Sequence, residues 1–159
     1  MRIVIAGSSG LIGTALAAAL RAQDHQITTL VRREPANPEE HRWDPPSAMV
    51  PSGALAGADA VINLCGAGIG DKRWTQERKQ VLLDSRITPT EVLAAAVARE
   101  SVPTLVNASA VGFYGDRGQE ELTEDAASGS GFLAELCREW EAATAAASEA
   151  GARVVQVRT

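Results

Sequence analysis

Three glycines near the N-terminus have the spacing of a loop that binds phosphate groups. Gly7, Gly10 and Gly13 lie between a short apolar run and a stretch with helical periodicity. At such a strand-to-helix turn, the first glycine permits a tight turn, the second lets the backbone approach a pyrophosphate, and the third allows close packing of the helix on the sheet. The N–H groups and the dipole of the helix N-terminus would then face the phosphates. The predicted dinucleotide contacts are Gly7, Ser8, Ser9, Gly10, Leu11, Ile12 and Gly13.

Two arginines stand where a dinucleotide-binding fold selects between NAD and NADP. Proteins that bind NAD carry an acid at the end of the second strand, about 20 residues past the glycines, but this sequence has Arg32 and Arg33 there. A guanidinium can bind a 2'-phosphate bidentately. We therefore predict NADP as the cofactor, with NAD less favoured and Ser8 and Ser9 as further hydroxyl partners. Two alternatives stay open, namely a solvent-exposed strand end capped by the arginines and a glycine-rich turn without a ligand.

The elements of the fold must bring these residues to one edge of a sheet. Short β-branched runs alternate with helical patterns, which predicts an α/β fold, a Rossmann-type doubly wound parallel sheet in three α/β/α layers. Parallel strands end at one common edge, where such folds bind ligands. The predicted strands are residues 2–6, 26–32, 41–44, 59–65, 104–109 and 153–157, and the predicted helices are 10–21, 75–100 with a kink at Pro89, and 132–150. The remainder of residues 33–57 is expected to be irregular.

Composition limits the classes of partner. The 159 residues carry a net charge of -5 and are 45% hydrophobic, which fits one domain over residues 1–159. No basic run could neutralise successive phosphates, so nucleic acid is not an expected partner, and a membrane span is not expected either. Cys65 and Cys137 lack CxxC spacing and no signal peptide precedes the first strand, which favours a reducing cytoplasm. His25 and His41 occur singly, so no metal site is predicted.

Several motifs resemble, in order along the chain, those of the extended short-chain dehydrogenase/reductases. They are the glycine spacing, the segment from Asp59 to Leu64 and the segment from Ser109 to Gly115. The residues from Lys72 to Thr75 and from Phe132 to Glu141 look like one branch, the NAD-dependent epimerase/dehydratase-like oxidoreductases, also labelled cell-division inhibitor-like. The resemblance implies an NAD(P) cofactor and members roughly twice this long, whose C-terminal substrate domain is absent from this chain. It also implies cofactor contacts at Leu64, Cys65, Gly66, Ala67 and Arg86.

The catalytic residues of that superfamily are only partly present. Its members use a Ser, an Asn and a Tyr-x-x-x-Lys pair for carbonyl polarisation and proton transfer. Ser109 takes the Ser position, although its loop is one residue longer than usual. The Asn, Tyr and Lys positions fall on Arg86, Leu133 and Cys137. Since Leu133 cannot transfer a proton, we predict Ser109 and Tyr114, the only tyrosine, as the catalytic residues, with Lys79 or Arg86 assisting. A Tyr114 that only packs in a turn is the alternative.

These residues support functions of two different classes. An NADP-dependent oxidoreductase or epimerase-like enzyme is favoured by Ser109 and by the polar segment 71–79, although this chain alone is not expected to turn over a substrate. A dinucleotide-binding sensor or regulator without catalysis is favoured by the missing Tyr-Lys pair, and a chain with neither property is the third alternative. The expected partners are the dinucleotide and an unidentified small-molecule substrate. An uncovered sheet edge would further favour a homodimer.

Overall fold

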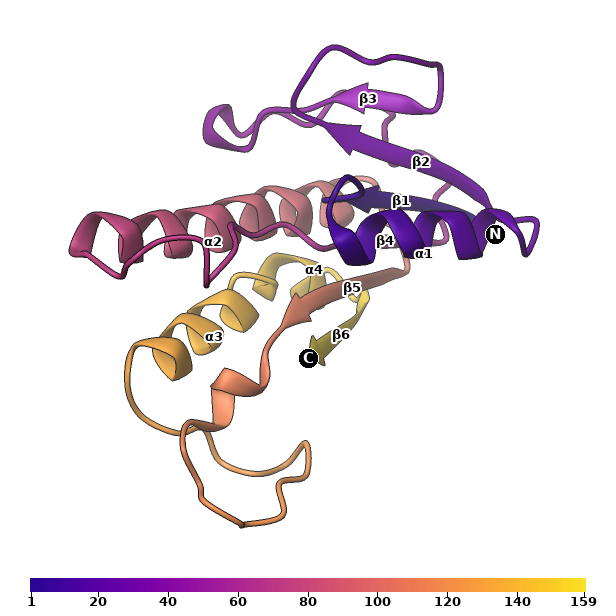
Figure 1. Ribbon diagram of the computed structural model, residues 1–159. Helices are drawn as coiled ribbons and strands as arrows, with labels where there is room; N and C mark the ends of the chain where they lie inside the picture. Colours follow the sequence, from indigo (N-terminus) through magenta and orange to yellow (C-terminus); the bar gives the residue numbers. More distant parts are fainter.

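The computed structural model describes residues 1–159 and contains a six-stranded parallel sheet with helices on both faces (Figure 1). The strand order is β3-β2-β1-β4-β5-β6, and every neighbouring pair is parallel. The strands are β1 (Arg2–Ala6), β2 (Gln26–Val31), β3 (Glu40–Arg42), β4 (Ala60–Asn63), β5 (Thr104–Ser109) and β6 (Arg153–Arg158). The helices are α1 (Leu11–Arg21), α2 (Gln76–Arg99), α3 (Phe132–Ala142) and α4 (Ala145–Glu149), with the short 3-10 helices η1 (Pro45–Ser47) and η2 (Val111–Tyr114).

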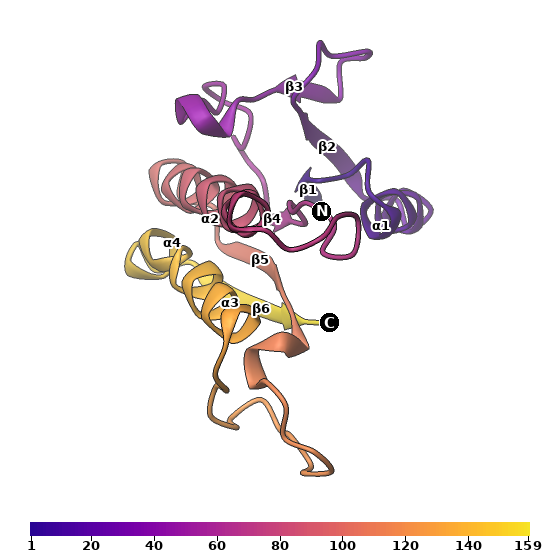
Figure 2. The same ribbon diagram turned by 60° about the vertical axis from the view of Figure 1, so that its left-hand side comes forward.

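The helices form two outer layers around the sheet. Figure 2 shows α1 on one side of the strands and α2, α3 and α4 on the other. The larger core cluster, of 15 buried residues, includes Val4, Val61, Leu93 and Leu105. The cluster on the α1 side has four, namely Ile3, Ile5, Ala17 and Ile27. β1 is therefore buried on both faces, as its continuous apolar run predicts. The predicted Rossmann-type sheet in three α/β/α layers is confirmed.

A row of amide side chains, two of them buried and the third half-buried, crosses the sheet near the carboxyl ends of three strands. Asn63 of β4, Asn107 of β5 and Gln156 of β6 are register partners. Asn63 Nδ2 donates to Asn107 Oδ1 at 2.7 Å, and Asn107 Nδ2 donates to Gln156 Oε1 at 3.2 Å. Thr90 Oγ1 of α2 accepts from Asn63 at 2.8 Å and from Trp140 Nε1 of α3 at 3.0 Å. This row, with its partners satisfied, fixes the strand ends from which the loops of the site depart.

Several elements differ from the sequence prediction. The helix predicted over 132–150 is two helices, because the chain turns at Thr144, whose hydroxyl donates to the Glu141 carbonyl at 2.7 Å. The 3-10 helix η2, which follows β5 closely, is not predicted by the sequence. β4 ends at Asn63, so the loop begins earlier than the predicted 59–65 strand implies. α2 continues through Pro89, which is buried and does not end the helix.

Candidate functional site

In the turn between β1 and α1, one glycine has room for a side chain and the other two do not. Gly7 has a φ of +81°, and a Cβ built there would lie 2.7 Å from the carbonyl carbon of Leu64. A Cβ at Gly13 would lie 2.7 Å from Cα of Ser8, because α1 packs directly on the loop. Gly10 differs, since the atom nearest to its Cβ position is the Gly7 carbonyl oxygen at 3.5 Å. The loop therefore has the tight turn and close packing that the glycine spacing predicts, and its open position is Gly10.

The first turn of α1 carries no side-chain cap. Gly10 is the N-cap residue, and the first turn contains no acidic residue. The hydroxyls of Ser8 and Ser9 donate to no partner in the chain, and Leu11 beside them is 92% exposed. Ile12 is also exposed. A helix N-terminus of this kind favours an anion, and a ligand lying along the turn would also cover the two apolar side chains.

The two arginines after β2 have different surroundings. Arg33 donates to both carboxylate oxygens of Glu40, at 2.7 and 2.8 Å. Hydrogen bonds from Arg33 and from the Ala36 N–H lower the pKa of Glu40 to about 2. Arg32 forms no ion pair, and it is close enough to Cys65 for its charge to act on that thiol. Arg32 is therefore exposed and without an ion-pair partner, whereas Arg33 is already bound by Glu40.

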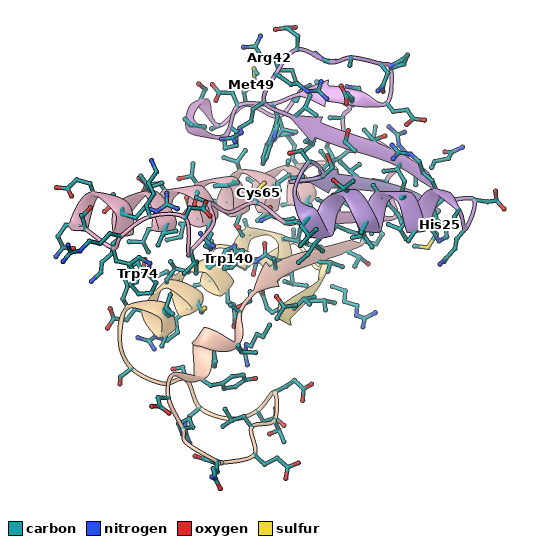
Figure 3. All side chains as sticks on the ribbon, viewed as in Figure 1. His25, Arg42, Met49, Cys65, Trp74 and Trp140 are labelled. Carbon is teal, nitrogen blue, oxygen red and sulfur yellow. The ribbon has the colours of Figure 1, made fainter.

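The segment Leu64–Ala67 lies beside the glycine loop at the end of β4. The Cys65 N–H donates to Asn63 Oδ1 at 3.1 Å, so the amide row fixes the start of this segment. Figure 3 shows Cys65 next to the N-terminal end of α1. Burial raises the pKa of the Cys65 thiol to about 12, against the opposing charge of Arg32, so the thiol is protonated at neutral pH. The predicted contacts from β1 and from β4 thus meet at one place on the sheet edge, where the strand order reverses.

Arg86 lies buried beneath this segment. It is 7% exposed, and it donates to the carbonyl oxygens of Ala67 at 3.0 Å and of Leu82 at 3.2 Å. Its guanidinium carbon lies 5.1 Å from the ring centre of Trp140, on the side of α3 that faces α2 (Figure 3). Arg86 therefore connects the loop after β4 to both helices.

Ser109 and Tyr114 belong to one buried hydrogen-bond network at the ends of β5 and β6. Ser109 is 3% exposed, and its hydroxyl donates to Glu141 Oε1 at 2.6 Å. Arg158, the register partner of Ser109 on β6, donates to the two carboxylate oxygens of Glu141 at 2.8 and 2.9 Å. Its Nη1 also donates to the Tyr114 hydroxyl at 2.9 Å. Both predicted catalytic residues are thus bonded to the Glu141–Arg158 ion pair.

The partner of Tyr114 is not one of those expected. The two predicted assistants each pack on an aromatic ring instead, Lys79 on Phe132 and Arg86 on Trp140. The prediction that one of them assists Tyr114 is therefore wrong, because α2 directs both side chains toward α3. Arg158 takes that place, since β6 runs beside β5 and ends opposite Ser109. A basic residue at the end of the last predicted strand is the sequence signal that could have indicated it.

The two α3 positions that match the Tyr and Lys of the superfamily offer no acid or base. A Cβ at Gly112 would lie 3.3 Å from Leu133 Cβ, so Leu133 packs directly under η2. Cys137 is buried, its Sγ lies 3.7 Å from the Ala110 carbonyl oxygen, and burial raises the pKa of its thiol. The polar side chains at this part of the edge are therefore those of the Ser109 network.

Replacement of Arg158 by Met should destabilise the protein, because it leaves Glu141 largely buried without its counter-ion. We expect a loss of about 2 kcal/mol in the free energy of unfolding at pH 7, less than for a fully buried pair because both side chains are slightly exposed. Urea unfolding measures it, with Arg153→Met, an exposed arginine on the same strand, as the control. Equal stabilities of the two variants would contradict a stabilising role of the pair.

The difference in unfolding free energy between the parent protein and Arg158→Met should depend on pH. Burial alone would raise the pKa of Glu141, but hydrogen bonds from Arg158 and Ser109 outweigh it, so the folded-state pKa is lowered. A lowered carboxyl pKa gives stability that is fully present above the unfolded-state pKa and is lost as the pH falls through the folded-state value. The stability gap between the parent and Arg158→Met should therefore narrow as the pH is lowered below about 4.

Other kinds of site have little support in the structure. No group of three His, Cys, Asp or Glu side chains is arranged to hold a metal ion. None of the helices has the length and apolar character that crossing a membrane would require. Cys65 and Cys137 are both free thiols. Trp43 and Trp140 lie in the core, whereas Trp74 is partly exposed at the end of the loop that precedes α2.

Comparisons with known proteins agree with this fold. A family model described as the NAD dependent epimerase/dehydratase family matches residues 3–159. An epimerase family protein of Mycobacterium bovis is 57% identical over 157 residues, which are 99% of this chain and 52% of that protein. The chain spans about half the length of the curated relatives it matches.

Two solved structures are similar over 99% of this chain. The nucleoside-diphosphate sugar epimerase of Corynebacterium glutamicum is 46% identical, with a TM-score of 0.87 and 33% of that chain covered. The human epimerase family protein SDR39U1, solved with NADPH, is 32% identical, with a TM-score of 0.84 and 53% of that chain covered. Both similarities extend over the glycine loop and the strand ends described above.

Proposed function

Since this chain belongs to the NAD-dependent epimerase/dehydratase family, we propose that residues 1–159 form a domain that binds NAD(P) at the carboxyl ends of β1 and β4. The geometry of the glycine loop carries this proposal. Gly7 and Gly13 have no room for a Cβ, whereas Gly10 faces open space beside an uncapped helix N-terminus. Backbone N–H groups that can be approached closely are what a pyrophosphate requires.

The proposed cofactor contacts fall into three groups. The glycine loop would hold the pyrophosphate, Arg32 would lie near the adenosine ribose, and the segment Leu64–Ala67 would lie along the other half of the dinucleotide. When bound, the nicotinamide supplies hydride transfer, and the protein binds and orients it. Titration with NADPH and NADH, followed by tryptophan fluorescence, tests the proposal. Failure to bind either nucleotide at concentrations up to about 1 mM would contradict it.

NADP is the proposed preference over NAD. The end of β2 carries Arg32 in place of an acid, and Arg32 has no carboxylate partner, so its guanidinium is free for a 2'-phosphate. The human relative at 32% identity was solved with NADPH. Arg33 contributes less to this proposal than the sequence suggests, since Glu40 already holds it.

Replacement of Arg32 by Ala should weaken NADPH binding about ten-fold to a hundred-fold and leave NADH binding nearly unchanged, because it removes a charged contact made only with the 2'-phosphate. Fluorescence titration of both nucleotides measures the two affinities. Arg33→Ala is the matched control, and its NADPH affinity should change by less than about three-fold because the side chain is paired with Glu40. Equal losses for both nucleotides, or tighter NADH binding by the parent protein, would show that Arg32 has another role.

An oxidoreductase or epimerase-like activity is the proposed chemistry of the whole protein, with Tyr114 as the proton donor or acceptor and Ser109 beside it. The support is the network in which Arg158 donates to the Tyr114 hydroxyl and Glu141 accepts from Ser109. A sensor or regulator without catalysis is the second candidate. The observation that favours it is the absence of an acid or base at Leu133 and Cys137.

Location and assembly are further proposals. The two free thiols, without CxxC spacing, support a reducing cytoplasm. β6 pairs with β5, and Val157 on this strand is exposed. A homodimer is the proposed assembly, and sedimentation of the purified chain would test it.

A further inference from the structure

Two arginines of α2 lie beneath the loop that joins β4 to α2. Arg86 donates to the Ala67 carbonyl at 3.0 Å, and Arg78 donates to the Gly68 carbonyl. Each leaves its Nε buried and without a hydrogen-bond partner. The two side chains are near enough that the charge of Arg78 adds to the effect of burial in lowering the pKa of Arg86. Two guanidinium groups of like charge are thus held together under one loop.

Neither guanidinium has an adequate counter-ion. No carboxylate pairs with Arg86, although it is 7% exposed. Asp71 is the one acid near Arg78, at 3.8 Å, and the side chain of Asp71 is 68% exposed. A buried charge without a partner is costly, so proteins rarely keep one unless a ligand supplies the opposite charge.

The loop above the arginines has free backbone N–H groups, and the Asp71 carboxylate lies against it beside Gly68. The N–H groups of Gly66, Gly68 and Gly70 donate to no acceptor in the chain, and all three residues are exposed. A Cβ at Gly66 would lie 3.1 Å from the guanidinium carbon of Arg86 and 3.4 Å from its Nε. The exposed Gly66 therefore lies directly against the guanidinium of Arg86, which has no carboxylate partner. Lys72 and Arg73, which follow in the same loop, add positive charge to a chain whose net charge is -5.

We propose that Gly68, Arg78 and Arg86, which follow the segment assigned to the cofactor, form a second anion site, which binds a carboxylate or phosphate group of the substrate. This rests on the proposed function, because the loop lies at the sheet edge that would hold the cofactor. The anion is assigned to the substrate because the dinucleotide would place its own phosphates on the glycine loop and on Arg32, on the β1 side of that edge. The substrate class is accordingly an anionic small molecule. Arg86 contributes charge from behind the loop, and the loop N–H groups make the direct contacts.

Inorganic phosphate is the probe for this site. Calorimetric titration of the 159-residue chain, against chloride of equal ionic strength, should show binding that persists with saturating NADPH and in Gly10→Val. Arg86→Met should bind phosphate at least about ten-fold more weakly, because the buried charge behind the loop is lost. Asp71→Asn should bind phosphate more tightly than the parent, since it removes the one acid that competes at the loop. Arg99→Met, on the same helix but exposed and distant from the loop, should leave phosphate binding unchanged.

The outcomes separate this proposal from the cofactor proposal. Full phosphate affinity in Arg86→Met overturns the second site, and so does competition between phosphate and NADPH, which would place the phosphate on the glycine loop. If Arg86→Met does not fold, Asp71→Asn decides, and an unchanged or weaker affinity in that variant overturns the proposal. Phosphate binding that depends on Arg86 in a protein that binds neither nucleotide would uphold the anion site and reject the proposed cofactor.

Discussion

Replacement of Gly10 by Val should lower NADPH affinity by a factor of about a hundred or more while the fold survives. Gly10 has a φ of -76°, which any residue adopts, and no atom lies closer than 3.5 Å to its Cβ position. A branched side chain therefore fits the free protein, at a cost of about 1 kcal/mol for a poorer N-cap. In the complex it would occupy the space through which the pyrophosphate reaches the N–H groups of α1.

The measurement pairs fluorescence titration of NADPH with a thermal melt of the same preparation. Gly70→Val is the matched control, since Gly70 also has open space around its Cβ position but lies outside the proposed pyrophosphate contacts. Gly13→Val should instead disrupt the loop itself, because its Cβ would clash with the backbone of Ser8. Its melting temperature should therefore fall as well as its NADPH affinity. Unchanged NADPH affinity in a folded Gly10→Val protein would contradict the assignment of this loop as the pyrophosphate site.

Replacement of Tyr114 by Phe should lower turnover by about a hundred-fold or more in a form of the protein that carries a C-terminal half of the length found in its relatives. General acid–base catalysis is worth that much, and the Tyr114 oxygen, 2.9 Å from Arg158 Nη1, is a phenol oxygen bonded to a cation. A cation there would stabilise the oxygen when its proton moves to the substrate. NADPH affinity should stay the same, because Tyr114 lies outside the proposed cofactor contacts.

Steady-state kinetics over a panel of anionic carbonyl compounds, together with NADPH titration, provides the readout. Phe113→Leu is the control for packing, because the Phe113 ring contacts the Arg158 guanidinium at 3.6 Å and carries no proton. Full activity in Tyr114→Phe would contradict the role of Tyr114 and would leave Ser109 and Glu141 as the candidates for proton transfer. Absence of turnover for every compound, in a protein that binds NADPH tightly, would make the sensor the better interpretation.

The features of this molecule that depend only on residues adjacent in the chain could be predicted from the sequence. The strand–helix alternation and the roles of Gly7 and Gly13 follow from short segments, and the structure has both. The Arg33–Glu40 pair could not be predicted, because it depends on β3 pairing beside β2 in a region without a clear pattern. Local sequence patterns predict individual helices and strands well, but they predict poorly which of these elements lie side by side in the fold.

The Glu141–Arg158 ion pair beside the candidate catalytic residues could not be predicted from local sequence patterns. Arg158 meets Glu141 only because β6 lies next to β5 and because α3 ends where it does. The break between α3 and α4 lies at Thr144, within a run of alanines with high helix propensity. Propensity alone predicts a continuous helix there, whereas in the structure the Thr144 hydroxyl and the Gln156 amide both hydrogen-bond to the Glu141 carbonyl at the break.

The amide row has a consequence for how the sheet assembles. Asn63, Asn107 and Gln156 come from three segments far apart in the chain, and parallel strands from such segments pair late and slowly during folding. Apolar β-branched strands buried on both faces discriminate weakly between one alignment and another shifted by two residues. A shift of β5 by two residues would move Asn107 away from both partners and leave amide groups unpaired in the interior. The row therefore favours the native register of β4, β5 and β6 over registers that are shifted by two residues.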